Sequence, residues 1–181
     1  MVTTMALSLL LLQAQASPSP APSPAIDAWL PVRFLVGEWE GESDGEPGKG
    51  TVKRSYRFVL GGKFLHEQNV STYPPQPRNA KGEVHEHWSF ISHDKVRRTL
   101  VFRQFHQESF VNQFVMGPVT PGNPIVFDSE ALENVPQGWK ARETYEVMSP
   151  DEFVETFELA MGDKPYAVYS KARFKRVGSR P

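Results

Sequence analysis

Residues 139–161 read WKARETYEVMSPDEFVETFELAM, two alternating runs on either side of a Ser-Pro-Asp sequence. Side chains two apart on a β-strand share a face, and Ser-Pro-Asp is typical of a tight turn. Placing Val147 opposite Phe153 collects the large apolar side chains of both runs on one face. This stretch therefore predicts a β-hairpin, and its register places Glu143 and Glu155 among those apolar residues.

The same pattern of alternating runs and turn signals continues through the chain from residue 34. Short turn sequences such as Gly61-Gly62 join neighbouring runs, and no connection is long enough for the helical crossover that parallel strands need. We therefore predict an all-β fold, a single antiparallel up-and-down β-barrel of about ten strands, because closure removes exposed sheet edges. A two-sheet sandwich is the alternative. The predicted strands cover residues 34–43, 50–60, 63–72, 83–92, 96–105, 109–116, 124–132, 138–148, 152–161 and 166–177.

Composition limits the classes of partner. The 181 residues include 20 Lys and Arg against 21 Asp and Glu, a net charge of −1. Nucleic-acid binding needs a concentrated basic face, so we expect no nucleic-acid partner. The chain has no cysteine, which excludes disulfides, thiolate metal sites and a cysteine nucleophile. Frequent aromatic residues between the turns favour a β-rich core.

The N-terminus has the features of a targeting segment. Residues 1–16 contain an apolar core followed by Ala14-Gln15-Ala16, a small-x-small cleavage pattern. The apolar run is far shorter than the ~20 residues that span a bilayer, so we expect no membrane span. Residues 17–25, SPSPAPSPA, predict a disordered spacer. We predict a signal peptide cleaved after Ala16, a periplasmic or secreted protein, and a barrel domain over residues 26–178.

Two further hairpins extend the predicted interior. A turn at Gly61-Gly62 groups Arg54 and Tyr56 with Glu67, and a turn at residues 93–95 groups Glu86 and Trp88 with Gln104. Charged groups in a packed core cost several kcal/mol each unless they are paired. They indicate either a water-containing cavity that orients a ligand or a self-satisfied network that fixes register. The predicted ligand-binding residues are Arg54, Tyr56, Glu67, Glu86, Trp88, Gln104, Asn112, Glu143, Tyr145, Glu155 and Phe157.

Two local groups of side chains could support other chemistry. His85 and His87 lie two apart and share a face, so both could reach one metal with His66 as a third ligand. The register above instead places all three on the outer surface beside arginines, and we predict no metal site. Glu143 and Glu155 could form an acid–base couple, but no nucleophile elbow, phosphate loop or dinucleotide fingerprint accompanies them. We therefore predict no catalytic residue.

Residues 36–41, VGEWEG, carry a Gly-x-Trp-x-Gly pattern at the first strand, and residues 171–177, KARFKRV, make the last strand basic. Together these two motifs resemble the calycin superfamily. In calycins a first-strand tryptophan packs at the closed end under a basic residue of the final strand. The resemblance implies that Gly37 and Trp39 close the barrel with Arg173 or Arg176, through a guanidinium stacked on the indole.

Within the calycins, the chain is similar to nitrobindin-type and related bacterial barrels of unknown function. Nitrobindins hold haem through a last-strand histidine, which would imply haem-dependent handling of nitrogen oxides. Residues 166–177 contain no His, Cys or Met, and Tyr169 or Lys171 falls near the corresponding place. The resemblance therefore implies the fold, and we predict no cofactor.

The leading functional hypothesis is an exported β-barrel that binds a small apolar or amphipathic molecule in its lumen. One alternative is a haem-binding, nitrobindin-like protein acting on reactive nitrogen species. Another is a ligand-free structural or partner-binding barrel. The sequence makes no prediction of ligand identity or oligomeric state.

Overall fold

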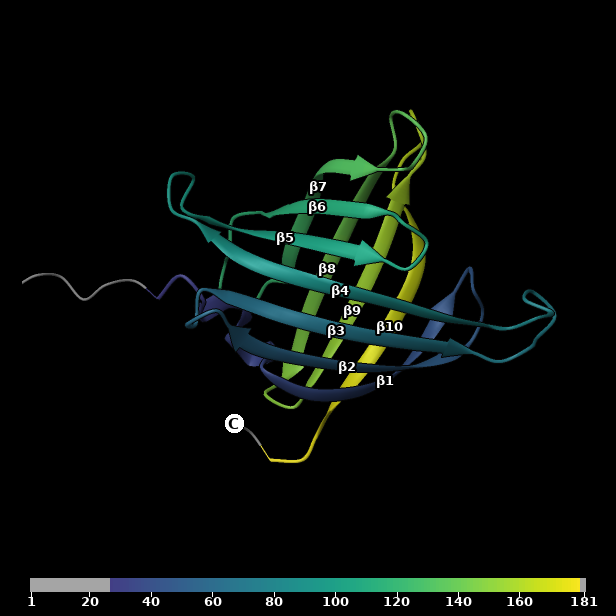
Figure 1. The fold of residues 1–181 in the computed structure, drawn as a ribbon, viewed down its shortest axis with the longest axis horizontal. Coiled ribbons are helices and arrows are strands. Elements are labelled where there is room, and N and C mark those ends of the chain that lie inside the picture. The colour runs from purple at the N-terminus through teal and green to yellow at the C-terminus, as the bar shows by residue number, and fades with distance from the viewer. Residues whose placement is uncertain (1–26, 180–181) are drawn as a thin grey trace, which may run out of the picture.

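The computed structural model describes residues 27–179. In this part of the chain ten antiparallel strands form a closed barrel in which β1 pairs with both β2 and β10 (Figure 1). This confirms the predicted up-and-down barrel in place of the sandwich. The strands are β1 (Gly37–Gly45), β2 (Gly50–Val59), β3 (Phe64–Tyr73), β4 (Glu83–Asp94), β5 (Thr99–His106), β6 (Val111–Met116), β7 (Ile125–Glu133), β8 (Lys140–Ser149), β9 (Glu152–Ala160) and β10 (Ala167–Val177).

The predictions for the N-terminus fall on residues that precede the described part of the chain. The predicted signal peptide, the predicted spacer and Ile26 lie outside the described residues. Between residues 27 and 179, no helix has the length and apolar character needed to cross a membrane.

One end of the barrel is filled by aromatic side chains. The Trp39 and Phe153 rings meet edge to face with centroids 4.7 Å apart, and Phe153 stacks on Phe174 at the same distance. A 3₁₀ helix, η1 (Leu30–Leu35), covers this end and buries Val32 and Leu35 against the rings. Offset and edge contacts of this kind add to the area that the rings bury. This end is therefore closed.

A single arginine completes the closed end. The Arg176 guanidinium lies 4.2 Å from the Trp39 ring centroid and donates to the Val36 and Phe34 carbonyl oxygens at 2.6 and 2.7 Å. Gly37 begins β1 with φ of +125°, a backbone conformation that L side chains rarely adopt. Of the two candidate arginines, Arg176 makes the predicted stack. Arg173 does not, because it faces outward, exposed, and pairs with Glu152.

Two of the three predicted registers agree with the structure. Val147 pairs with Phe153 across β8 and β9, and Tyr56 pairs with Glu67 across β2 and β3. In the β4–β5 hairpin, however, Gln104 pairs with Ser89. The odd-numbered residues of β4 therefore face inward, and the predicted face of this strand was wrong.

The turn explains the error. Strand β4 continues to Asp94, whose carboxylate accepts from the Val96 and Arg97 backbone N–H groups at 2.9 and 3.0 Å. Arg98 then adopts φ of +56° before β5 begins at Thr99. The turn thus occupies residues 95–98, and because strand side chains alternate, an odd shift in pairing reverses the face.

Candidate functional site

The lumen contains a cavity of about 460 Å³ that extends from the charged centre of the barrel to its open end. Its wall has two different sides. Strands β2 to β5 contribute mostly hydrogen-bonding groups, including Arg54, Asn69 and Gln104. Strands β7 and β9 and the loop before β8 contribute mostly apolar groups, namely Leu132, Val135, Trp139, Phe157 and Leu159.

Arg54 organises the polar side. Its guanidinium is buried, pairs with Glu155 across the lumen, and lies 3.0 Å from a Glu67 carboxylate oxygen. It also donates to Asn69 Oδ1 at 2.9 Å and stacks 4.5 Å from the Phe174 ring centroid. A planar guanidinium with several donors suits such convergent pairing. Arg54 therefore joins Glu67, Asn69 and Glu155 in one interior network, and Arg54, Asn69 and Glu155 also line the cavity.

Glu67 is the ionised member of this network. Burial alone would raise the pKa of its carboxyl, but the Arg54 charge and the His87 hydrogen bond outweigh that effect and lower the pKa to about 2. The Tyr56 hydroxyl donates to the same carboxylate at 3.1 Å. Glu67 is therefore a fixed negative charge at neutral pH.

Glu143 behaves in the opposite way. Burial, reinforced by the nearby Glu155 charge, raises the pKa of the Glu143 carboxyl well above its usual range. Gln104 Nε2 donates to Glu143 Oε1 at 3.2 Å, while Oε2 has no hydrogen-bond partner among the described residues. A neutral carboxyl on the cavity wall can donate to a ligand.

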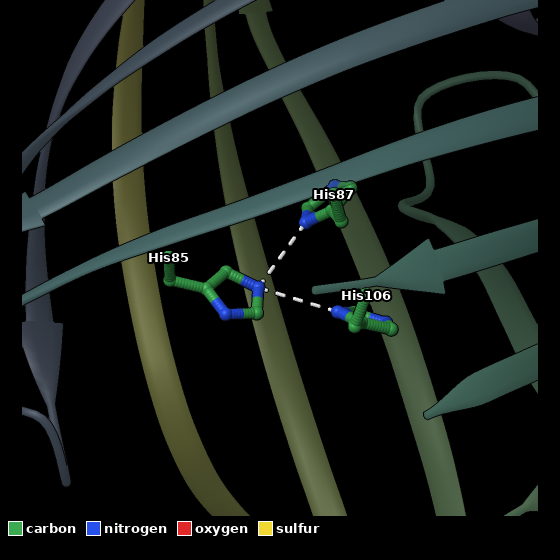
Figure 2. Close-up of side chains that lie close together, drawn as sticks. All are labelled: His85, His87 and His106. Carbon is green, nitrogen blue, oxygen red and sulfur yellow. Dashed lines mark hydrogen bonds between the residues drawn. The ribbon is translucent and has the colours of Figure 1, made fainter. Parts of the chain in front are cut away.

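Three histidines converge at the open end of the polar side. His85 and His87 come from β4 and His106 from β5, and Figure 2 shows their rings pointing toward one another. His85 Nε2 lies 3.4 Å from His87 Nδ1 and 3.2 Å from His106 Nδ1. The expectation that His85 and His87 face outward was wrong, for the reason of the β4–β5 turn. The partner in the structure is His106, not His66.

His106 is uncharged at neutral pH. Burial, with the His87 and His85 charges second, lowers the pKa of its imidazole to about 3. Asn112 Nδ2 lies 3.1 Å from His106 Nε2 and also donates to Gln104 Oε1 at 3.2 Å. A chain of hydrogen bonds therefore links the histidine cluster to Gln104 and on to Glu143.

The structure divides the predicted ligand-binding residues into three groups. Glu86 and Trp88 lie on the outer face of β4, and Trp88 is 54% exposed, so neither lines the lumen. Tyr56, Glu67 and Tyr145 are buried beneath the cavity. The cavity wall contains Arg54, Gln104, Asn112, Glu143, Glu155 and Phe157.

The outer face of β4 made the alternation misleading. Trp88 and Phe90 pack there against His66, whose ring stacks on Phe90 with centroids 4.7 Å apart. This strand therefore carries rings on both faces, Trp88 and Phe90 outside and the histidines 85 and 87 inside. Two features of the sequence would have identified the inner face of β4. One is Asp94, whose side chain caps the turn. The other is the His-x-His spacing of residues 85 and 87, opposite a third histidine on the next strand.

The arrangement does not fit the last-strand haem ligation that the family resemblance implies. On β10 the cavity wall consists of Tyr169, Ser170 and Ala172, and Lys171 is exposed. The lumenal histidines stand on β4 and β5, and β5 lies five strands from β10 in the closed order. Because β10 has no histidine, this strand cannot ligate a haem iron in the way that the family resemblance implies.

Fold and site together define a closed ten-stranded antiparallel barrel whose lumenal cavity has a polar and an apolar side. No protein-family model matches the chain, and neither does any curated protein. Among solved structures it is similar to Rv2717c from M. tuberculosis, a nitrobindin-family barrel, with a TM-score of 0.62 and 15% identity over 86% of this chain and 99% of that one. The match to a de novo designed fluorescence-activating β-barrel covers 84% of this chain and 100% of that one at 14% identity, with a TM-score of 0.32.

Proposed function

We propose that this barrel is a binding protein that holds a small amphipathic molecule in its lumen. The observation that carries the proposal is the two-sided wall of the cavity of about 460 Å³. Cavities of this size suit small ligands, and a few polar groups on an otherwise apolar wall orient them. An amphipathic molecule would lay its apolar part against Phe157 and Leu159 and its polar part toward Arg54, Gln104 and Glu143.

The polar groups are placed to recognise a ligand as well as to stabilise the barrel. Arg54 and Glu67 form a buried ion pair at the floor of the cavity, with Arg54 Nε 3.0 Å from Glu67 Oε1. Among the described residues, Glu143 Oε2 and Glu67 Oε2 are both buried without a hydrogen-bond partner, and of these two glutamates only Glu143 lines the cavity wall. Buried polar atoms usually have partners, so a ligand acceptor facing the Glu143 hydroxyl would supply the missing hydrogen bond. An exported location, which the first 16 residues predict, would make the ligand an extracytoplasmic molecule.

A compact amphipathic dye tests the proposal. The naphthalene dye 1-anilinonaphthalene-8-sulfonate should bind the full chain saturably, with one dye per barrel and enhanced fluorescence. Ser170 lies on the cavity wall of β10, whereas Val168, on the same strand, is 55% exposed. A Ser170→Trp variant should obstruct the lumen and weaken dye binding about tenfold, about 1.4 kcal/mol, while the matched Val168→Trp variant should bind as the parent does.

Fluorescence titration of the three proteins measures the affinities, and circular dichroism checks that each variant is folded. Equal affinity in both tryptophan variants, or non-saturating binding in the parent, would show that the dye sits outside the lumen and would refute lumenal binding.

A further inference from the structure

We propose that His85, His87 and His106 form a binding site for a divalent late-transition-metal ion, zinc in the simplest case, at the open end of the lumen. The site is independent of the small-molecule proposal, because it uses a different set of side chains and needs no occupant in the rest of the cavity. Three imidazoles that converge from two adjacent strands constitute the site.

The nitrogen positions fit the size of such an ion. Zinc–nitrogen bonds are about 2.0–2.1 Å long, so two nitrogens on one tetrahedral zinc lie about 3.4 Å apart. The His85–His87 and His85–His106 nitrogen pairs are 3.4 and 3.2 Å apart. One nitrogen from each of the three rings lies within 4.8 Å of the other two. Small ring rotations would therefore bring all three onto one ion.

The backbone explains this convergence. His85 and His87 are two residues apart on β4 and share its inner face, and His87 pairs directly with His106 across the β4–β5 ladder. The three side chains thus start from neighbouring points on one wall, as Figure 2 shows.

In two of the three rings, a carboxylate lies next to the nitrogen that faces away from the other histidines. Glu108 Oε1 lies 2.9 Å from His85 Nδ1, and Glu67 Oε1 lies 3.4 Å from His87 Nε2. Metal-ligating histidines typically donate their second N–H to a carboxylate, which fixes the tautomer and orients the lone pair toward the ion. Here the carboxylates would leave His85 Nε2 and His87 Nδ1 as ligand atoms, and these are the nitrogens that face each other.

His106 needs a local adjustment to bind metal through Nδ1. Its Nε2 must then carry the proton, and the Asn112 amide, whose Nδ2 lies 3.1 Å away, must turn its oxygen toward that N–H. The same rotation ends the Asn112 Nδ2–Gln104 Oε1 hydrogen bond, so the Gln104 amide must turn with it and accept from the neutral Glu143 carboxyl. Asn112 is therefore a positioning residue for the third ligand.

The charges around the cluster favour a cation. Glu67 and Glu108 bring two carboxylates to the site, and the Glu67 oxygen that lies near His87 also pairs with Arg54. Arg103 lies on the outer wall, away from the three histidines, and donates to Gln113 Oε1 and Ser92 Oγ. Imidazole ligands suit zinc, copper, iron and nickel. Three protein ligands leave a coordination position open toward the cavity, where water or a ligand with a lone pair can bind.

Metal titration of the full chain, stripped with chelator, tests the site. We expect Co²⁺ to bind with one ion per chain and a visible d–d spectrum, and Zn²⁺ to displace it. His85→Ala and His106→Ala should each weaken binding at least about 100-fold, because even second-shell changes cost 10–100-fold. The matched controls are the remaining histidines of the chain, and His66→Ala and His93→Ala should leave the affinity unchanged.

Glu108→Gln provides a milder variant in case a histidine variant fails to fold, and it should weaken Zn²⁺ binding about 10–100-fold. Thermal unfolding with and without Zn²⁺ gives a second readout, since a ligand of the native state raises the melting temperature. Absence of stoichiometric binding by the parent, or equal binding by the His85→Ala and His66→Ala variants, would overturn the site. Dye binding by the metal-free parent would be unaffected by that outcome.

Discussion

Two buried glutamates of the lumen differ in charge because their neighbours differ. Glu67 contacts Arg54 at 3.0 Å, which lowers its carboxyl pKa against the effect of burial. Glu143 has Gln104 as its hydrogen-bond partner and Glu155 as a nearby charge, so burial dominates and its pKa rises. The carboxyl of Glu67, beneath the cavity, is therefore a fixed anion, and that of Glu143, on the cavity wall, is a neutral acid.

Replacing Glu143 by Gln tests this difference. Its pKa in the folded barrel lies above the unfolded value near 4.5, so ionisation opposes folding, and the penalty grows as pH rises from that value toward the folded pKa. Glu143→Gln removes the penalty. The variant should therefore gain stability relative to the parent as pH rises from about 5 to 8, with a slope of at most about 1.4 kcal/mol per pH unit.

Urea unfolding at several pH values measures the effect. The exposed Glu146 of the same strand supplies the control, and Glu146→Gln should follow the parent at every pH. Parallel stability curves for the Glu143→Gln variant and the parent would mean that Glu143 ionises freely in the folded barrel.

At the scale of elements, sequence alternation predicted the inner faces of most strands. The β8–β9 and β2–β3 registers followed from it because each of these strands has one clearly apolar face. It failed on β4, where Trp88 and Phe90 pack on the outer face against His66. The histidine cluster was missed for that reason alone. Which carboxyl is neutral could not be predicted either, because Arg54 and its partner Glu155 lie 101 residues apart in the chain.

The hydrogen bonds between Arg176 of β10 and the carbonyls at the end of η1 lead to a prediction about the free energy of unfolding. Arg176→Met keeps an apolar chain over Trp39 but removes the donors to the Phe34 and Val36 carbonyls. Hydrogen bonds from charged donors contribute about 1.5–3 kcal/mol, and the partly buried carbonyl acceptors left without a donor add to the loss. The variant should therefore lose about 2–4 kcal/mol of unfolding free energy, and Arg176→Lys should recover only part of it, since an ammonium lacks the planar fork.

Chemical denaturation provides the measurement. Arg173→Met is the matched control on the same strand, and because its ion pair with Glu152 is exposed, it should cost less than about 1 kcal/mol. Equal losses in the two methionine variants would show that the stack on Trp39 does not hold the closed end together.

For the molecule as a whole, closure follows from nine connections that join consecutive antiparallel strands, but the contents of the lumen depend on which side chains meet across it. Strand β1 closes on β10 where Gly41 passes close to the partner backbone, since a Cβ there would lie 2.7 Å from the Arg173 carbonyl oxygen. Across the lumen the Arg54–Glu155 pair joins β2 to β9. The barrel is thus held by its ladders around the circumference and by one charged bridge through its centre.

The Arg54–Glu155 bridge leads to a prediction about the stability of the barrel. Arg54→Met leaves two buried carboxylates, Glu67 and Glu155, without their cation, and removing one partner of a buried ion pair costs about 3–5 kcal/mol. The triple variant Arg54→Met/Glu67→Gln/Glu155→Gln removes the uncompensated charges and should regain more than half of the loss. The deficit of the single variant should also shrink as pH falls, because protonation of the two carboxyls relieves it. Denaturant unfolding at neutral and acidic pH would measure both effects, and a triple variant no more stable than Arg54→Met would show that the guanidinium stabilises the barrel through its packing on Phe174 and not through its charge.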